Sequence, residues 1–520
     1  METNLKVCLI ILDGWGIGAH DQSNPIFLTG TPYMDYLKEN YPYTALQASG
    51  IASGLAWLKE GSSETGHLIM GSGRIVFPAS LRIDAAIRDN SFFEEKTIIN
   101  TINTAKQKGA AIHFITMLST GEGYTNPRHL KALLDLLMQE QFDNAYFDLI
   151  LDGLDGRSLQ EAKELIMDFQ QKLLDRKVGK ISSICGRFYA LNKDHNPEYI
   201  NKYFNLVTQS QGQVLKAEEL PSFLDEHYKN NMNDDFVIPV AITDETFHPL
   251  QQNDIVFFFN AKSKHEATEY LVNKFLESNY QVYSLAEYTN IPKENICFFE
   301  EKIDNTLSQI LSNNKKRQIR ITEEIKQNHI TNVFNGFHGA PFPGEYWTII
   351  PGIKSLRFQD NPEMMAGSIT ERTLQALEEN IYDFILINYP NADQAGHSGN
   401  MEIGQRIVKF LDEEIKKVID SALKQNYYVL ITADHGNIER MLDPFTGKPE
   451  SSHDSSLVPL FLISNRWKAN MPKTPGDINA TENQATGLLS DIAPTILEIM
   501  GIIKPQEMTG TSILKSLNLF

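Results

Sequence analysis

Three apolar segments, each with an aspartate at its carboxyl end, constrain the fold of this chain more than any other feature. They cover residues 7–14 (VCLIILDG), 384–393 (FILINYPNAD) and 427–436 (YYVLITADHG). Runs rich in Val, Ile and Leu and bounded by turn residues are typical of buried parallel strands. Because ligands of open α/β sheets bind outside the carboxyl ends of the strands, we expect Asp13, Asp393 and Asp434 to meet at one edge of a single sheet.

Histidines stand close to two of these aspartates. His397 lies four residues after Asp393, so a helical turn can direct both side chains at one ion. His435 follows Asp434 directly, and His453 lies in the segment SSHD. Taken singly, each of these residues is more simply a helix cap, a turn residue or an ordinary histidine. Together, carboxylate and imidazole donors suit Mn²⁺, Zn²⁺, Co²⁺ or Fe²⁺, and they predict a two-metal site.

A serine supplies a candidate nucleophile for this site. Ser63 lies in the segment 61–74 (GSSETGHLIMGSGR). A serine between glycines and acids is ordinarily a turn residue. A serine hydroxyl is also a poor nucleophile unless a base or a bound metal activates it. A position beside the acidic cluster would therefore give Ser63 a role in phosphoryl transfer.

Several segments resemble one known family. They are LDGWGIG (12–18), GSSETGHLIMGSGRIV (61–76), NADQAGHSG (391–399), ITADHGN (431–437) and EMTGTSIL (507–514). These motifs are similar to those of cofactor-independent (2,3-bisphosphoglycerate-independent) phosphoglycerate mutase, of the alkaline phosphatase superfamily, and the resemblance covers the whole chain. It implies interconversion of 3-phosphoglycerate and 2-phosphoglycerate, in glycolysis and gluconeogenesis, through a phosphoserine intermediate.

The resemblance also implies a fold of the α/β class. An alkaline-phosphatase-like parallel-sheet domain would comprise residues 1–78 and 316–520, and an inserted α/β phosphotransferase domain residues 79–315. In the inserted region the sequence itself predicts strands at 111–118, 144–153, 180–186 and 254–261, and helices at 129–140 and 159–177. We expect the chain to cross between the domains near Phe77–Ser80 and Ser312–Arg317. These two crossings predict a pair of hinges, one of them at Pro78, that allow closure over substrate.

Site residues follow from the resemblance by position. Ser63 is the residue that becomes phosphorylated. One metal set is Asp13, Ser63, Asp434 and His435, and the other is Asp393, His397 and His453. The cofactors implied are two divalent metal ions, with Mn²⁺ favoured. Lys326 matches a lysine of the phosphate site, and Arg157 and Arg187 match two substrate-binding arginines.

The substrate side departs from the family pattern at five positions, which are Tyr124, Ser158, Lys193, Lys262 and His265. Tyr124 replaces a histidine, and Ser158 replaces the acid expected to shuttle a proton. Lysine in place of arginine keeps the charge but loses the bidentate fork that grips carboxylate or phosphate. Asp152 or Asp155 could replace the missing acid. These changes leave open a metal-dependent phosphatase, or a phosphomutase for another small phosphate ester.

A third alternative is a non-catalytic relative, but burying so many acids without a metal would cost stability. The net charge of −19 argues against nucleic-acid or anionic-membrane partners. Three widely spaced cysteines form no zinc or disulfide pattern. Neither a signal peptide nor a run long enough for a membrane span is evident. We therefore expect a cytoplasmic enzyme that acts on a small phosphorylated substrate, and the resemblance implies a monomer.

Overall fold

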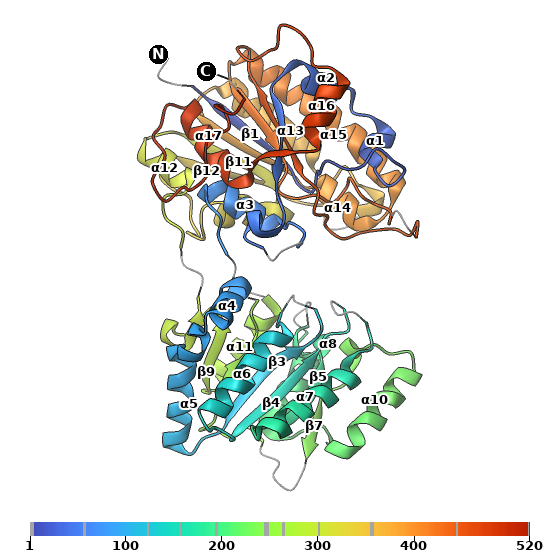
Figure 1. Ribbon diagram of the computed structural model, residues 1–520, viewed down its shortest axis with the longest axis vertical. Helices are drawn as coiled ribbons and strands as arrows, with labels where there is room; N and C mark the ends of the chain where they lie inside the picture. Colours follow the sequence, from blue (N-terminus) through green and yellow to red (C-terminus); the bar gives the residue numbers. More distant parts are fainter. Residues whose placement is uncertain are drawn as a thin grey trace. The chain divides into compact units, whose positions relative to one another are not determined.

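The computed structural model of this protein describes residues 5–55, 59–77, 79–121, 124–154, 158–192, 196–243, 249–262, 266–299, 302–353, 358–443, 446–517 and 519. The chain divides into two compact units, one formed by Met1–Phe77 with Glu301–Phe520 and the other by Pro78–Glu300. The first unit thus contains both the blue amino-terminal and the red carboxyl-terminal segments (Figure 1). Residues 301–315, which the sequence analysis placed in the inserted domain, belong to this first unit. The hinge expected at Pro78 falls on a residue outside the described ranges.

A mixed sheet forms the centre of the first unit. Its eight strands, counted over the described residues, follow the order β12-β11-β13-β1-β14-β15-β2-β16. Their bounds are β1 (Val7–Leu12), β2 (Tyr43–Gln47), β11 (Gln318–Glu323), β12 (Glu345–Ile350), β13 (Phe384–Tyr389), β14 (Tyr428–Thr432), β15 (Val458–Ile463) and β16 (Ala485–Leu488). β1 lies between β13 and β14 and pairs in parallel with both. The three segments that end in aspartate are therefore neighbouring parallel strands, as the sequence predicts.

Helices bury the apolar faces of this sheet. They are α1 (Pro25–Thr29), α2 (Pro32–Asn40), α3 (Ser63–Ser72), α12 (Leu307–Asn313), α13 (Ala366–Glu379), α14 (Asn391–Ser398), α15 (Met401–Lys424), α16 (Pro475–Glu482) and α17 (Ile492–Ile499). α15 shows why such segments are helical. Asn400 caps its first turn by accepting hydrogen bonds from the backbone of Glu402 and Ile403. Ile407, Leu411 and other apolar residues at helical spacing then face the core.

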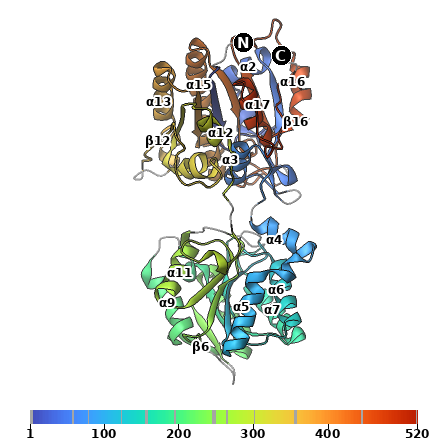
Figure 2. The ribbon, with the colours of Figure 1, turned by 90° about the vertical axis from the view of Figure 1, so that its left-hand side faces the viewer.

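The second unit contains another sheet with helices on both faces (Figure 2). Over the described residues its strand order is β10-β9-β8-β3-β4-β5-β7-β6. The strands are β3 (Ile112–Leu118), β4 (Ala145–Leu151), β5 (Lys180–Gly186), β6 (Gln213–Lys216), β7 (Val240–Thr243), β8 (Ile255–Phe258), β9 (Gln281–Ala286) and β10 (Ile296–Phe298). The pairing is parallel except between β5 and β7. All four strands predicted for this region are present.

Alternation along the strands divides the core of the second unit between the two faces. Ile112 and Phe114 of β3 belong to one apolar cluster, which includes α5 (Lys96–Lys108), α6 (Pro127–Gln139), α7 (Ala162–Arg176) and α10 (Leu220–Lys229). Ile115 and Met117 belong to the other, which includes α8 (Arg187–Ala190), α9 (Pro197–Gln209) and α11 (Glu266–Glu277). α4 (Ala79–Arg88) begins the unit. The predicted α/β class with two parallel-dominated sheets is confirmed.

Among the helices of the described ranges, none combines the length and the apolar composition needed to cross a bilayer.

Candidate metal centre

The three strand-end aspartates lie together at the carboxyl edge of the first sheet. Asp13 follows β1 directly, Asp434 lies just beyond β14, and Asp393 sits in the first turn of α14, shortly after β13. All three are buried. Gly14 allows this close approach, because it has a positive φ of 73° and a Cβ at this position would lie 2.7 Å from the Asp393 Cα.

Ser63 and Lys326 complete the middle of the cluster. Ser63 is the first residue of α3, and its Oγ lies 3.1 Å from Asp13 Oδ1 and 3.0 Å from His435 Nε2. The Lys326 ammonium group donates hydrogen bonds to Ser63 Oγ at 2.7 Å, to Asp13 Oδ1 at 2.7 Å and to Asp393 Oδ2 at 2.9 Å. One buried cation therefore contacts the candidate nucleophile and two of the three carboxylates.

The histidines are oriented by backbone carbonyl groups. The Nε2 atoms of His397 and His453 lie 3.1 Å apart, and each is 3.3 Å from Asp393 Oδ1. The Nδ1 atom of His397 faces Ser451 O at 2.9 Å, and that of His453 faces Gly61 O at 2.9 Å. Because a carbonyl oxygen only accepts, each Nδ1 carries a proton, and each Nε2 is directed at the cluster. Such outer contacts are typical of metal-binding histidines.

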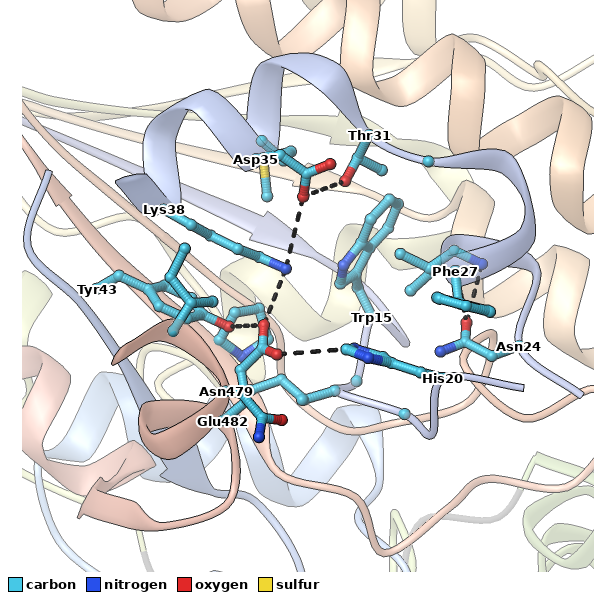
Figure 3. Close-up of a pocket in the computed structure, with 18 of the residues that line it drawn as sticks. Trp15, His20, Asn24, Phe27, Thr31, Asp35, Lys38, Tyr43, Asn479 and Glu482 are labelled. Carbon is cyan, nitrogen blue, oxygen red and sulfur yellow. Dashed lines mark hydrogen bonds and ion pairs between the residues drawn. The ribbon is translucent and has the colours of Figure 1, made fainter. Parts of the chain in front are cut away.

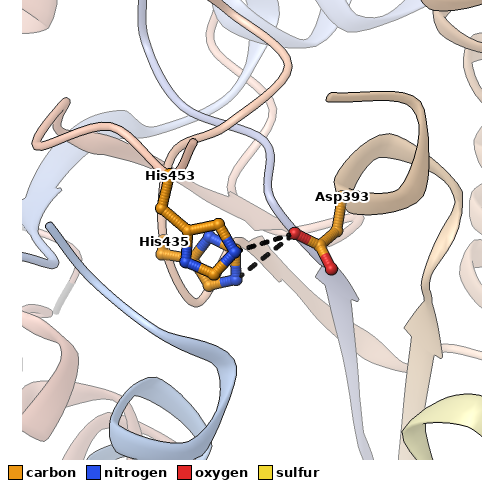
Figure 4. Close-up of side chains that lie close together, drawn as sticks. All are labelled: Asp393, His435 and His453. Atoms are coloured by element: carbon orange, nitrogen blue, oxygen red, sulfur yellow. Dashed lines mark ion pairs between the residues drawn. The ribbon is translucent and has the colours of Figure 1, made fainter. Parts of the chain in front are cut away.

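Residues from distant parts of the chain meet in this group of rings. His435 and His453 stack with ring centroids 3.9 Å apart, beside the Asp393 carboxylate (Figure 4). All the residues that the sequence analysis assigned to the two metal sets thus form one continuous cluster with Lys326.

His67 also belongs to the cluster, and sequence reasoning did not select it. Its Nδ1 lies 3.1 Å from Asp434 Oδ2, and its Nε2 lies 3.1 Å from Asn388 Oδ1. Asn388 in turn donates to Asp13 Oδ2 at 3.1 Å. The sequence could have indicated His67, because it lies four residues after Ser63 and so shares a helix face with it.

The donor set fits divalent cations. Asp393, His435 and His453 place three ligand atoms within 4.8 Å of one another, and so do Asp13, His67 and Asp434. Three carboxylates face a single ammonium group, so two negative charges remain when the imidazoles are neutral. Asp434 Oδ2 is buried, and its nitrogen neighbours in the described ranges are imidazole atoms, His67 Nδ1 at 3.1 Å and His435 Nε2 at 3.6 Å. A bound cation would satisfy this acceptor and balance the excess charge.

The charged groups of the cluster shift one another's pKa values. Burial opposes charge on His435, but the carboxylates of Asp434 and Asp13 outweigh it and raise the His435 pKa to about 9. Burial also opposes charge on Lys326, whose pKa is nevertheless raised by Asp13 and Asp393. Hydrogen bonds from His397 and His453 overcome burial and hold the pKa of Asp393 far below its usual range. A metal ion bound through His435 must therefore displace a proton at neutral pH.

A second polar cluster lies at the carboxyl edge of the other sheet. Arg187, which follows β5, donates to Asp152 Oδ1 at 2.6 Å and to the Tyr124 hydroxyl at 3.3 Å. The Arg187 guanidinium lies 5.1 Å from the Tyr124 ring centroid, and Lys262 Nζ lies 4.8 Å from the same centroid. Two cations thus contact one buried aromatic ring.

Ser158, another predicted substrate residue, forms no hydrogen bond with this cluster within the described ranges. Ser158 is exposed, and its hydroxyl accepts a hydrogen bond from the Gln160 backbone at 3.2 Å, as a turn residue does. Arg157, Lys193 and His265 lie outside the described residues, and so does Asp155.

A separate cavity of about 370 Å³ lies in the first unit and is lined partly by Trp15 (Figure 3). Glu482 is paired with its neighbours in this cavity. Its Oε1 accepts hydrogen bonds from the Tyr43 hydroxyl at 2.9 Å and from Lys38 Nζ at 2.9 Å, and His20 Nε2 lies 3.9 Å from Glu482 Oε2.

Known proteins with similar sequences cover this chain almost completely. The family model of the Metalloenzyme superfamily matches residues 5–504. A 2,3-bisphosphoglycerate-independent phosphoglycerate mutase of Clostridium botulinum is 33% identical over 98% of this chain and 99% of its own. One from Francisella philomiragia is 34% identical over 98% of each chain.

Among solved structures, the phosphoglycerate mutase of Leishmania mexicana, determined at low cobalt concentration, matches with a TM-score of 0.74. The match covers 98% of this chain and 97% of that one, at 21% sequence identity, so it shows a shared fold.

Proposed function

Since this chain belongs to the Metalloenzyme superfamily and, within it, to the 2,3-bisphosphoglycerate-independent phosphoglycerate mutases, as its motifs indicated, we propose that it interconverts 3-phosphoglycerate and 2-phosphoglycerate through a phosphoserine formed on Ser63. It is then an isomerase that acts on a small phosphorylated substrate. The single observation that carries the proposal is the placement of Ser63 Oγ within hydrogen-bond distance of Lys326, Asp13 and His435.

We propose two divalent ions as cofactors, with Mn²⁺ favoured by the family resemblance. One would be held by Asp13, Ser63, Asp434 and His435, and the other by Asp393, His397 and His453. His67 supports the first set through its contact with Asp434. When bound, such ions supply Lewis-acid activation of the serine hydroxyl and neutralise charge on the phosphoryl oxygens.

In the first half-reaction, Ser63 Oγ forms a bond to phosphorus while the bond from phosphorus to the C3 oxygen of the glycerate breaks. The hydroxyl proton leaves Ser63, and the departing glycerate oxygen gains a proton. Lys326 stabilises the charge on the phosphoryl oxygens, because its ammonium already points at Ser63 Oγ. The amino terminus of α3 favours the phosphorylated state, since Ser63 is the first residue of that helix.

In the second half-reaction, the C2 hydroxyl of the same glycerate attacks the phosphoserine and loses its proton, while the bond from phosphorus to Ser63 Oγ breaks and Oγ regains a proton. Tyr124, Arg187 and Lys262 would hold an anionic group of the glycerate, with Arg157, Lys193 and His265 as further candidates. Asp152 serves better as an anchor than as a base, because Arg187 occupies its Oδ1 and Ser119 Oγ donates to its Oδ2 at 2.6 Å.

A second candidate function is a metal-dependent phosphatase, or a phosphomutase for another small phosphate ester. The exposed Ser158 favours it, because the acid expected at that position to shuttle a proton is absent. In a phosphatase, water instead of a glycerate hydroxyl would attack the phosphoserine. For either function we propose a cytoplasmic monomer without a nucleic-acid or membrane partner, in keeping with the net charge of −19.

A phosphorus NMR time course tests the proposal directly. The full chain is supplied with Mn²⁺ and 3-phosphoglycerate, without any bisphosphoglycerate. A growing 2-phosphoglycerate resonance supports the mutase, and growth of inorganic phosphate alone supports the phosphatase. If neither forms while Ser63 is phosphorylated by another ester, the substrate assignment is wrong. The Ser63→Ala variant is the negative control for both reactions.

A further inference from the structure

Glu439 is a buried glutamate in the loop that follows β14, and it contacts the loop that follows β1. These two loops carry most of the metal cluster. Glu439 is 1% exposed. Its Oε2 accepts a hydrogen bond from the Gly16 backbone at 2.9 Å and another from the Asn437 backbone at 2.8 Å. Gly16 belongs to the loop that follows β1 and begins with Asp13. Asn437 belongs to the loop that follows β14 and contains Asp434 and His435, so one carboxylate oxygen joins the two loops.

Both loops leave space for this carboxylate by having glycines where it lies. A Cβ on Gly16 would be 2.3 Å from Glu439 Cδ, and one on Gly436 would be 2.2 Å from Glu439 Oε1. A Cβ on Gly18 would be 2.6 Å from the Glu439 carbonyl oxygen. Real Cβ atoms do not approach other atoms so closely, so larger residues at these positions would displace the glutamate or the loops.

The contacts extend from Glu439 to the third aspartate. Asn437, whose backbone is held by Glu439, donates through Nδ2 to Asp393 Oδ1 at 3.0 Å and to the Asp393 carbonyl at 3.2 Å. The two loops are further joined by hydrogen bonds from the Gly14 backbone to Asp434 Oδ1 at 3.1 Å and from Ile438 to Gly14 at 3.0 Å. Asp393 is thus linked to Glu439 through Asn437, and Asp434 bonds to Gly14 of the loop that Glu439 holds. Asp13 directly precedes Gly14 in that loop.

We propose that Glu439 is a positioning residue that holds the loops of Asp13 and Asp434, and through Asn437 the Asp393 side chain, in the arrangement that binds metal. The proposal rests on the metal centre proposed above. Glu439 itself lies outside the ligand sets and acts through other residues. Retaining a buried carboxylate costs folding free energy, and burial together with the Asp454 charge raises its pKa. Holding the metal ligands in place explains why a glutamate is buried at position 439 despite this cost.

Asp412 offers a matched control for the chemistry of Glu439. Asp412 is 6% exposed and also accepts two backbone hydrogen bonds, from Tyr33 at 3.0 Å and from Met34 at 2.9 Å. These cap the amino terminus of α2, and neither donor belongs to a loop of the metal cluster. Removing the Asp412 carboxylate therefore removes the same kind of contact from the same unit without touching the loops.

The experiment measures Mn²⁺ affinity by isothermal titration calorimetry on metal-stripped full-length protein, and thermal unfolding of the same samples. We expect Glu439→Ala to weaken Mn²⁺ binding about 10- to 100-fold, the usual range for outer contacts of metal ligands. Glu439→Gln keeps an oxygen that can accept both hydrogen bonds, so its affinity should stay within about threefold of wild type. Asp412→Ala should lower the unfolding temperature but leave Mn²⁺ affinity unchanged.

The Glu439→Asp variant provides a second test in case the Glu439→Ala variant does not fold. It keeps the charge but withdraws the oxygen from the two backbone donors, and it should weaken Mn²⁺ binding in the same direction. Affinity within twofold of wild type for Glu439→Asp or Glu439→Ala would overturn the proposal, and so would an equal loss in Asp412→Ala. Wild-type protein that binds no Mn²⁺ would instead refute the metal centre itself, so the two failures are distinguishable.

Discussion

The Lys326 ammonium group lies 2.7 Å from the hydroxyl oxygen of Ser63 and hydrogen bonds to it. The same ammonium group bonds to Asp13 and Asp393, so the buried positive charge and the buried negative charges stabilise one another. A cation in this position both offsets the acids and faces the oxygen that would carry the phosphoryl group. Stability and catalysis therefore depend on the same side chain.

Replacing Lys326 by Met should destabilise the metal-free protein by about 3–5 kcal/mol, because breaking a buried ion pair leaves uncompensated charge. Chemical denaturation of the metal-free protein measures this loss, and added Mn²⁺ should restore part of it. Lys172→Met is the matched control, since Lys172 pairs with Asp168 on the surface and such pairs contribute little. Equal losses in both variants would contradict the structural role of Lys326.

Ser63→Ala should abolish turnover, with a fall in kcat of at least about a thousandfold, because nothing else in the cluster replaces the nucleophile. Mass spectrometry of acid-quenched wild type should detect phosphate on Ser63 during turnover, and the variant should carry none. The fold should persist, with an unchanged circular dichroism spectrum. Full activity in Ser63→Ala would disprove both the mutase and the phosphatase mechanism.

The metal-free protein should lose stability as the pH rises from about 6.5 to about 9. The folded-state pKa of His435 is raised from 6.5 to about 9 by the neighbouring carboxylates. The stabilisation from its protonated form is therefore complete below pH 6.5 and lost as the pH rises through about 9. Urea unfolding of metal-free protein at several pH values measures the effect. The slope over this range should be smaller in His435→Gln, and an identical slope would exclude His435 as its source.

Arg187→Lys should raise the KM for 3-phosphoglycerate about tenfold, because lysine cannot reproduce the bonds that the guanidinium makes to Asp152 and Tyr124. Charge-assisted hydrogen bonds are worth about 1.5–3 kcal/mol, which corresponds to at least a tenfold change in binding. Steady-state kinetics provide the measurement, and Mn²⁺ affinity should not change. Arg176→Lys, which alters a partly buried ion pair with Asp135, should leave KM as it is. A KM shift of the same size in both variants would rule out a specific role.

Local sequence patterns were sufficient for seven of the described strands and for the acidic cluster. Each of the three strands in the first sheet that lead to an aspartate is a mainly apolar run, as a strand buried on both faces requires. Once those strands are parallel neighbours, Asp13, Asp393 and Asp434 must meet at one edge. The pairing of His397 with Asp393 was likewise local, because a four-residue spacing on a helix brings the side chains together.

The sequence by itself thus determined the parallel strands, their acidic ends and the family to which the chain belongs. Only the tertiary structure decided what surrounds those acids. Glu439 and Asn437 have no periodicity or spacing that marks them. Glu439 matters through its bond to the Gly16 backbone, 423 positions away in the chain, and Asn437 through its bond to Asp393, 44 positions away. The contact between Asp152 and Arg187 likewise joins residues that no local pattern relates. Hydrogen bonds between distant segments depend on the folded path of the chain, and a linear pattern carries no information about that path.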